Sequence, residues 1–232
     1  MKQIILLRTL RKDLVLVLII AVLIITSIDF WLINIPECFI GGHKIGQIFR
    51  ALSMSYISAF ILYLLVVHYK QYKDKTILYP YIISQINIIK ERATTIGDVL
   101  RRKTKITINN KYPTDTDIET ICSSLNPKSK APLQFGLNGR NANWLEYFIH
   151  YRKDSLEAID KIFVKIPFLD SKLVKIISGI ETCSFYKMLD NSSILLETDV
   201  RNIEFLKTQL IDYFVLIKEL EEYVNKHIVI YK

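Results

Sequence analysis

The sequence lacks the short motifs that identify the common enzyme and metal-binding classes. Its 232 residues contain no P-loop, no nucleophile elbow, no His-Glu-x-x-His pattern and no closely spaced pair of cysteines. His68, His150 and His227 share no spacing typical of a catalytic triad, and Cys38 with His43 supplies too few ligands for a metal ion. We therefore expect no catalytic residue, no cofactor and no metal site, and the chain is predicted not to be an enzyme.

Cysteines and strand patterns are also scarce. Cys38, Cys122 and Cys183 are too few and too widely separated for a disulfide framework. We expect Cys122 and Cys183 to be reduced thiols in the core and Cys38 to be a free thiol. No long stretch alternates polar and apolar residues with period two, and only residues 105–112 (KITINNKY) resemble a strand. The predicted fold class is all-α.

Long apolar runs are abundant. Half of the residues are hydrophobic, and residues 14–28 and 51–67 carry no charge. With their flanks they predict two membrane-spanning helices over about residues 14–35 and 46–68, because a span needs roughly 20 apolar residues. A cleaved signal peptide is the alternative for the first run. It is disfavoured because the run is long, no A-x-A-like site follows, and a second run comes directly after it.

The basic residues predict the orientation of these spans. They gather before the first span and after the second, while only Lys44 lies in the connecting loop; the flanking ones are Lys2, Arg8, Arg11, Lys12, Lys70, Lys73 and Lys75. Because basic loops stay cytoplasmic, both termini are expected in the cytoplasm. The predicted organisation is a two-helix transmembrane hairpin over residues 1–75, followed by a cytoplasmic helical domain over residues 76–232.

Each predicted span contains one charged residue near its outer end. Asp29 and Arg50 each lie roughly 9 Å inside a helix, so they could share a depth and form a pair. Ionisable groups in lipid are costly unless paired or hydrated, which favours a functional interpretation as a gate. The alternative is that both lie in the headgroup zone, with Arg50 extended toward water.

The second span is also partly polar. Ala51, Ser55 and Ala59 recur at every fourth position, a pattern that allows close helix approach. Several copies arranged around an axis could line a pore with this helix, and the candidate pore or gate residues are Asp29, Gln47, Arg50, Ser55 and Ser58. The alternative is that the small residues only pack the helix against its own hairpin partner.

Helical patterns dominate the rest of the chain. Helices are predicted over residues 77–102, from Thr114, over 145–163 and after Asp170, whereas residues 126–141 are predicted to form a loop. Apolar residues between Ile203 and Val224 alternate steps of three and four over about three heptads. Such a seam can support self-association, although one this short is also typical of an ordinary packed face.

The densest basic cluster suggests a binding surface. From residue 70 onward the chain has 25 Lys and Arg against 20 Asp and Glu, a mild excess. Cations beside aromatic rings can hold phosphates and stack bases. The candidate ligand-binding residues are Arg101, Arg102, Lys103, Lys105, Lys128, Lys130, Arg140 and Trp144. The alternative is a solvated basic face beside aromatic residues that belong to the core.

Two spans followed by a basic helical domain resemble the small two-span membrane effectors of bacterial antiphage defence operons. This architectural resemblance implies a homo-oligomeric channel or membrane-disrupting pore in the bacterial inner membrane, controlled by an anionic nucleotide or oligonucleotide from a partner enzyme. It carries over no individual residue. The alternative function is a membrane-anchored adaptor whose helical domain recruits a protein partner.

Overall fold

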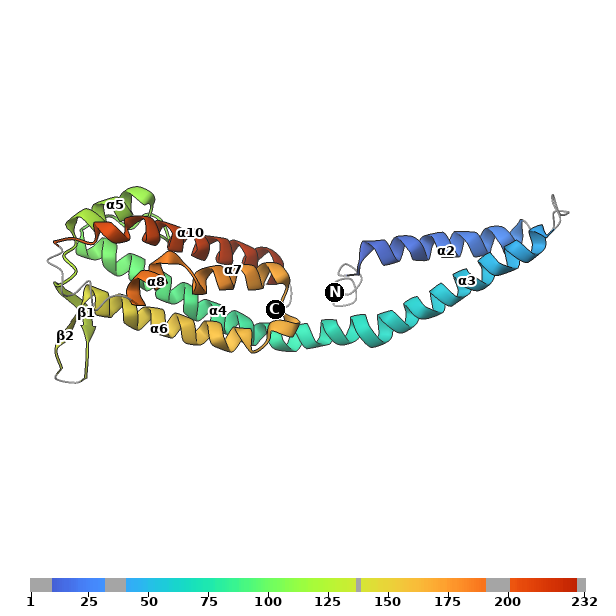
Figure 1. Ribbon diagram of the computed structural model, residues 1–232, viewed down its shortest axis with the longest axis horizontal. Coiled ribbons are helices and arrows are strands. Elements are labelled where there is room, and N and C mark those ends of the chain that lie inside the picture. Colours follow the sequence, from blue (N-terminus) through green and yellow to red (C-terminus); the bar gives the residue numbers. More distant parts are fainter. Residues whose placement is uncertain (1–9, 32–40, 137–138, 191–200, 229–232) are drawn as a thin grey trace. The chain divides into compact units, whose positions relative to one another are not determined.

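The computed structural model of the chain describes residues 10–31, 41–136, 139–190 and 201–228 (Figure 1). It is mostly helical, which confirms the predicted all-α class. The chain divides into two compact units, Met1–Thr76 and Ile77–Lys232, where the sequence had placed a boundary between residues 75 and 76. Cys38 and residues 32–35 of the first predicted span lie outside the described residues.

The first unit contains the helices long and apolar enough to cross a membrane. Helix α2 spans Lys12–Phe30 and α3 spans Gly42–Leu62. A π-helical stretch, η2 (Tyr63–His68), follows and leads into α4 (Tyr69–Lys103). Only 6% of the most apolar window of the first helix and 17% of that of the second is buried within the protein. The apolar core helix of a water-soluble protein is covered by its neighbours, so these helices need an apolar surrounding from elsewhere.

Helices α2 and α3 pack side by side in opposite directions (Figure 1). At one end the Tyr56 hydroxyl donates to the Leu14 carbonyl oxygen at 2.9 Å. Near the other end Arg50 meets Asp29. The buried side chain Ser53 of α3 lies on the same helical face as Tyr56. One face of α3 is therefore used against α2.

The second unit is a bundle built around α4. Its other helices are α5 (Asp115–Ser124), α6 (Trp144–Phe163), α7 (Ser171–Glu181), α8 (Ser184–Asp190) and α10 (Lys207–Tyr223). Short turns η3 (Ile166–Phe168), η4 (Glu204–Leu206) and η5 (Val224–Ile228) complete it. The buried residues of α4 follow helical spacing along one face: Tyr79, Ile82, Ile86, Ile89, Ala93, Ile96 and Leu100. This one-sided face forms part of the hydrophobic core of the unit.

The predicted heptad seam lies inside this core. All of its members are buried within one chain: Ile203, Leu206, Leu210, Tyr213, Ile217, Leu220 and Val224. Helix α10 packs on α5, α7 and α8 of the same chain. The interpretation of the seam as a self-association surface is therefore wrong, since its apolar residues already have partners.

The only strands among the described residues lie where a loop was predicted. Strands β1 (Lys130–Gln134) and β2 (Asn141–Asn143) pair antiparallel, with Lys130 opposite Asn143 and Gln134 opposite Asn141. Pro132 is tolerated in β1 because both strands of a two-stranded hairpin are edge strands. Residues 105–112, which resemble a strand in sequence, form a loop that follows the end of α4.

The predicted helix starts at Thr114 and near residue 145 are confirmed, whereas the helix predicted from residue 77 begins earlier, at Tyr69. The Thr114 side chain accepts from the Asp117 backbone N–H at 3.2 Å, and the Asp117 carboxylate accepts from the Thr114 N–H at 2.9 Å, which is a capping box. Helix α6 covers the predicted 145–163 and ends before the turn that contains Pro167. Asp170 stands directly before α7, but its carboxylate accepts from the Tyr79 hydroxyl at 3.1 Å and makes no cap bond.

Gly97 of α4 is fixed by close packing. A Cβ placed there would lie 2.8 Å from Pro113 Cδ, whereas a Cβ at Gly179 of α7 would meet only Leu216 Cδ2, at 3.5 Å. Alanine stabilises the interior of a helix by about 1 kcal/mol relative to glycine. A side chain that overpacks the core lowers the stability by about 1–3 kcal/mol. We expect Gly97→Ala to lower the free energy of unfolding and the matched Gly179→Ala to raise it by up to about 1 kcal/mol.

The measurement is urea unfolding of the full chain in detergent, in a Trp31→Phe background, so that fluorescence reports the buried Trp144 of the second unit. Equal midpoints for the two variants would contradict the packing of α4 on Pro113.

Candidate functional site

The two charges of the hairpin form an ion pair. Arg50 Nε lies 3.1 Å from Asp29 Oδ1, and both side chains remain partly exposed. Because an unpaired charge in an apolar environment costs several kcal/mol, the pair removes much of the penalty of placing either group in these helices. The pair is closed within one chain, so neither charge needs a second copy.

Several further polar residues of α3 lie on the face turned away from α2, whereas Ser53 and Tyr56 face it. Gln47, Ser55 and Ser58 are exposed, and so are the small residues Ala51 and Ala59. Ser58 donates to the Met54 carbonyl oxygen at 3.0 Å, and Gln47 Nε2 lies 3.0 Å from His43 Nε2. The alternative that the small residues pack α3 against α2 is therefore wrong. This side of the helix, with its small residues and two serines, has no covering within the described residues of this chain.

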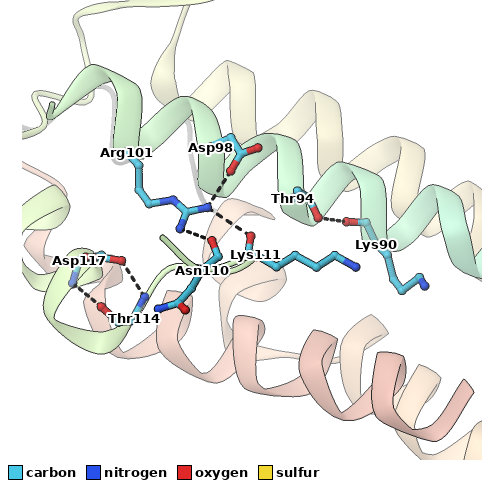
Figure 2. Close-up of polar contacts among 8 residues, drawn as sticks. All are labelled: Lys90, Thr94, Asp98, Arg101, Asn110, Lys111, Thr114 and Asp117. Atoms are coloured by element: carbon cyan, nitrogen blue, oxygen red, sulfur yellow. Dashed lines mark hydrogen bonds and ion pairs between the residues drawn. The ribbon is translucent and has the colours of Figure 1, made fainter. Parts of the chain in front are cut away.

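Arg101 is not part of the basic surface that the sequence predicted. Its side chain is 0% exposed and points from α4 toward the following loop (Figure 2). The guanidinium donates to Asp98 Oδ1 at 2.7 Å, to the Asn110 carbonyl oxygen at 2.6 Å and to the Lys111 carbonyl oxygen at 3.2 Å. A buried cation with three such partners holds the loop in place and cannot also reach an external ligand.

Its neighbours at the end of α4 remain exposed. Arg102, Lys103 and Lys105 all face solvent. Lys105 has a φ of 58°, and the Ile106 N–H bonds back to the Arg101 carbonyl oxygen at 2.9 Å, which closes the helix as a Schellman motif does. A lysine in place of the usual glycine is strained at this positive φ.

The β-hairpin region contributes fewer binding groups than predicted. Lys128 and Lys130 are exposed. Arg140 forms two bonds with the Glu146 carboxylate, at 2.8 and 2.5 Å, and this pairing lowers the pKa of Glu146. Trp144 is fully buried, with its indole N–H on Ser129 Oγ at 3.0 Å, so it offers no surface for stacking a base.

An open pocket of about 340 Å³ lies between the loop after α4 and helix α10. It is lined by Asn110, Lys111, Tyr112, Thr114, Lys218, Glu221 and Glu222. This volume is at the lower end of the range for small-molecule sites. Its lining offers two cations and two carboxylates, so it does not select an anion by charge alone.

Glu221 is the most strongly engaged carboxylate of this pocket. Lys111 forms an ion pair with it, and Lys90 Nζ lies 3.7 Å from its Oε1. Burial on its own raises the pKa of Glu221, but the hydrogen bond from Lys111 and the nearby ammonium charges of Lys111 and Lys90 outweigh it, and the pKa lies below its ordinary value. Sequence reasoning missed Lys90 and Glu221, because they come from helices far apart in the chain and only the fold brings them together.

The eight predicted ligand residues thus separate into three groups. Arg101 and Trp144 are buried, Arg140 is ion-paired, and the exposed cations are Arg102, Lys103, Lys105, Lys128 and Lys130. The end of α4 and the β-hairpin lie at the same end of the second unit (Figure 1). Within the described ranges, no three His, Cys, Asp or Glu side chains gather in a way that could hold a metal ion.

Comparison with protein-family models, with curated proteins and with solved structures finds no match.

Arg101 is expected to act on stability. Removing one member of a buried ion pair typically costs about 3–5 kcal/mol, so Arg101→Met should lower the free energy of unfolding by that order. The exposed neighbour Arg102 provides the matched control, and Arg102→Gln should change the stability by less than about 0.5 kcal/mol. The measurement is the same Trp144 fluorescence titration. Equal small effects at both positions would contradict the anchoring role of Arg101.

Glu221 predicts an acid-sensitive contribution to stability. Its pKa is lower in the folded than in the unfolded chain, so its contribution is present above the ordinary value of 4.5 and is lost as the pH falls through the lowered folded value. Glu221→Gln should therefore flatten the acidic arm of a plot of unfolding midpoint against pH. The exposed neighbour Glu222 gives the control, Glu222→Gln. An unchanged acidic arm in the Glu221 variant would refute this role.

Proposed function

We propose that this chain is a homo-oligomeric membrane effector, in which hairpins from several copies form an ion channel or membrane-disrupting pore and the helical unit controls it. The observation that supports this best is the outward face of α3. That face carries Ser55 and Ser58 between the small residues Ala51 and Ala59, away from the partner helix. Small side chains that face lipid alone gain nothing, whereas a neighbouring copy could pack closely against them and a water-filled pore could hydrate the serines.

The ion pair has a defined place in this proposal. Because Arg50 and Asp29 neutralise each other inside one hairpin, they would lock its two helices together rather than line the pore as separate charges. Gating would then move the outward faces of α3 from neighbouring copies relative to one another, while the ion pair keeps the two helices of each hairpin together. The gate residues of the proposal are Gln47, Ser55 and Ser58, with Asp29 and Arg50 as the lock.

Control by a ligand is the second part of the proposal. An anionic nucleotide or oligonucleotide from a partner enzyme would contact the exposed cations at the end of α4 and at the β-hairpin: Arg102, Lys103, Lys105, Lys128 and Lys130. A ligand can shift a closed-to-open equilibrium only by its preference for the open state. The basic flanks of the spans support placing both termini in the cytoplasm, and the resemblance to antiphage effectors supports the bacterial inner membrane.

The outward face of α3 can be tested by a pair of substitutions. Ser55→Leu adds bulk to the small face, whereas Met54→Leu conserves volume at an exposed position one residue away. In liposomes loaded with a fluorescent dye sensitive to ions, Ser55→Leu should reduce ion flux at least tenfold, and Met54→Leu should leave it within twofold. Unmodified protein without any flux, under all candidate ligands, would contradict the pore.

A membrane-anchored adaptor is the second candidate function. It is favoured by the closure of the Asp29–Arg50 pair within one hairpin, since a monomeric anchor has no other requirement for its charges. Exchange of residues 1–76 for an unrelated two-span hairpin separates the two candidates. An adaptor keeps its cellular activity after the exchange, and a pore loses it while expression and membrane localisation persist.

A further inference from the structure

The second unit exposes a short apolar turn at one of its ends. Between α6 and α7, Val164 is 73% exposed, and Ile166 and Phe168 of η3 also face solvent with Pro167 between them. Isolated exposed apolar residues are common on soluble proteins. Three large ones within five positions, on a turn that contributes none of them to the core, form a patch of the kind that marks an interaction surface.

Contacts place this turn at the end of the unit where α4 begins. Asp170, directly after the turn, accepts from Tyr79 of α4 at 3.1 Å and from Tyr223 of α10 at 3.4 Å. The ends of α6 and α10 and the start of α7 lie together at this end of the second unit (Figure 1). The apolar turn therefore shares an end with the first residues of the unit, among them the exposed Ile77 and Tyr81.

Lysines flank the apolar turn along the chain. Lys161, Lys165, Lys172 and Lys175 lie between the end of α6 and the middle of α7, in a stretch that also carries Glu157, Asp160 and Asp170. Lys161 is paired with Glu157 at 2.7 Å, and Asp170 accepts from the Tyr79 and Tyr223 hydroxyls. Lys165, Lys172 and Lys175 form no ion pair within the part of the chain that the structure describes, although Lys172 Nζ stands 5.9 Å from the centre of the Tyr223 ring. Large apolar side chains flanked by such lysines match the chemistry of an anionic lipid surface.

The start of the second unit follows the second predicted span closely along the chain. Residues 69–76, the first residues of α4, join the span predicted over residues 46–68 to the helical unit, and a chain of this length reaches no more than about 30 Å. They carry Lys70, Lys73 and Lys75, which favour the same anionic surface.

We propose that the turn Val164–Phe168 and its lysines dock on the anionic lipid surface of the membrane that holds the hairpin. The apolar side chains enter the headgroup region, and the ammonium groups contact lipid phosphates. Docking fixes the helical unit against the bilayer, so that a rearrangement of that unit is transmitted to the spans. It requires only that the hairpin sits in the bilayer, and not that it conducts.

The test uses the full chain in vesicles, in a Cys38→Ser background. A bimane fluorophore is attached at Ile166→Cys or, as the control, at the exposed Val215→Cys of α10; Cys122 and Cys183 are buried and protected from labelling. The vesicles contain brominated phosphatidylcholine, with or without phosphatidylglycerol. Quenching by the bromines reports contact of the label with lipid.

With phosphatidylglycerol present, we expect quenching at residue 166 to exceed that at residue 215 at least twofold. Lys165→Gln, Lys172→Gln and Lys175→Gln together should abolish the excess. Equal quenching at the two positions, or an excess that the triple variant retains, would overturn the proposal. An excess that appears only at high protein density would also overturn it, since a second copy would then cover the turn. Co-flotation of every variant with the vesicles shows that the hairpin is inserted, and ion flux is measured separately.

Discussion

The second unit depends on a single physical constraint, which is that α4 is apolar on one side only. From Tyr79 to Leu100 its buried residues follow one helical face, and each fully buried isoleucine contributes roughly 1.5–3 kcal/mol. α10 and the other helices of the bundle complete the core that this face requires. Arg101 and Asp170 secure the two ends, because each binds groups from a neighbouring segment and so fixes where the covering helices begin and end. The apolar residues of α2 and α3 cover more than one face, and most of them are left uncovered by protein.

That contrast explains which features the sequence could predict. Helical periodicity located α4, α6, α7 and α10, and the Thr114 signature located the start of α5, because burial of one face and capping are local properties of the chain. The roles of Arg101 and Trp144 could not be predicted. A sequence does not show whether a given basic or aromatic residue faces solvent or the core. For Arg101 the packing of α4 against its loop decides this, and for Trp144 the packing of α6 against β1 does.

The strand-like segment has a similar explanation. Residues 105–112 alternate in character, but the backbone carbonyls of Asn110 and Lys111 accept from Arg101, which holds this segment as a loop against α4. The β-hairpin formed instead in a segment rich in Pro, Gly and Asn, where the turn residues lie between two short extended stretches. The heptad spacing of α10 indicated a buried face. The spacing alone does not show whether that face packs against the same chain or against another copy.

The proposed function joins two surfaces that the fold leaves uncovered. The outer face of α3 carries small and hydroxylated residues, and the turn after α6 carries apolar residues and lysines. The first would bring copies together within the bilayer. The second would hold each helical unit at the membrane surface. A ligand bound to the exposed cations could then act on the spans through a helical unit that is fixed to the bilayer.

The central claim is that several copies assemble, and the most direct measurement is the mass of the unmodified full chain in detergent micelles, with the detergent contribution subtracted by combined light scattering and refractive index. The account predicts one defined assembly of three or more copies, the smallest number that can enclose a pore. A strict monomer, both alone and with candidate nucleotides present, would contradict it and favour the adaptor.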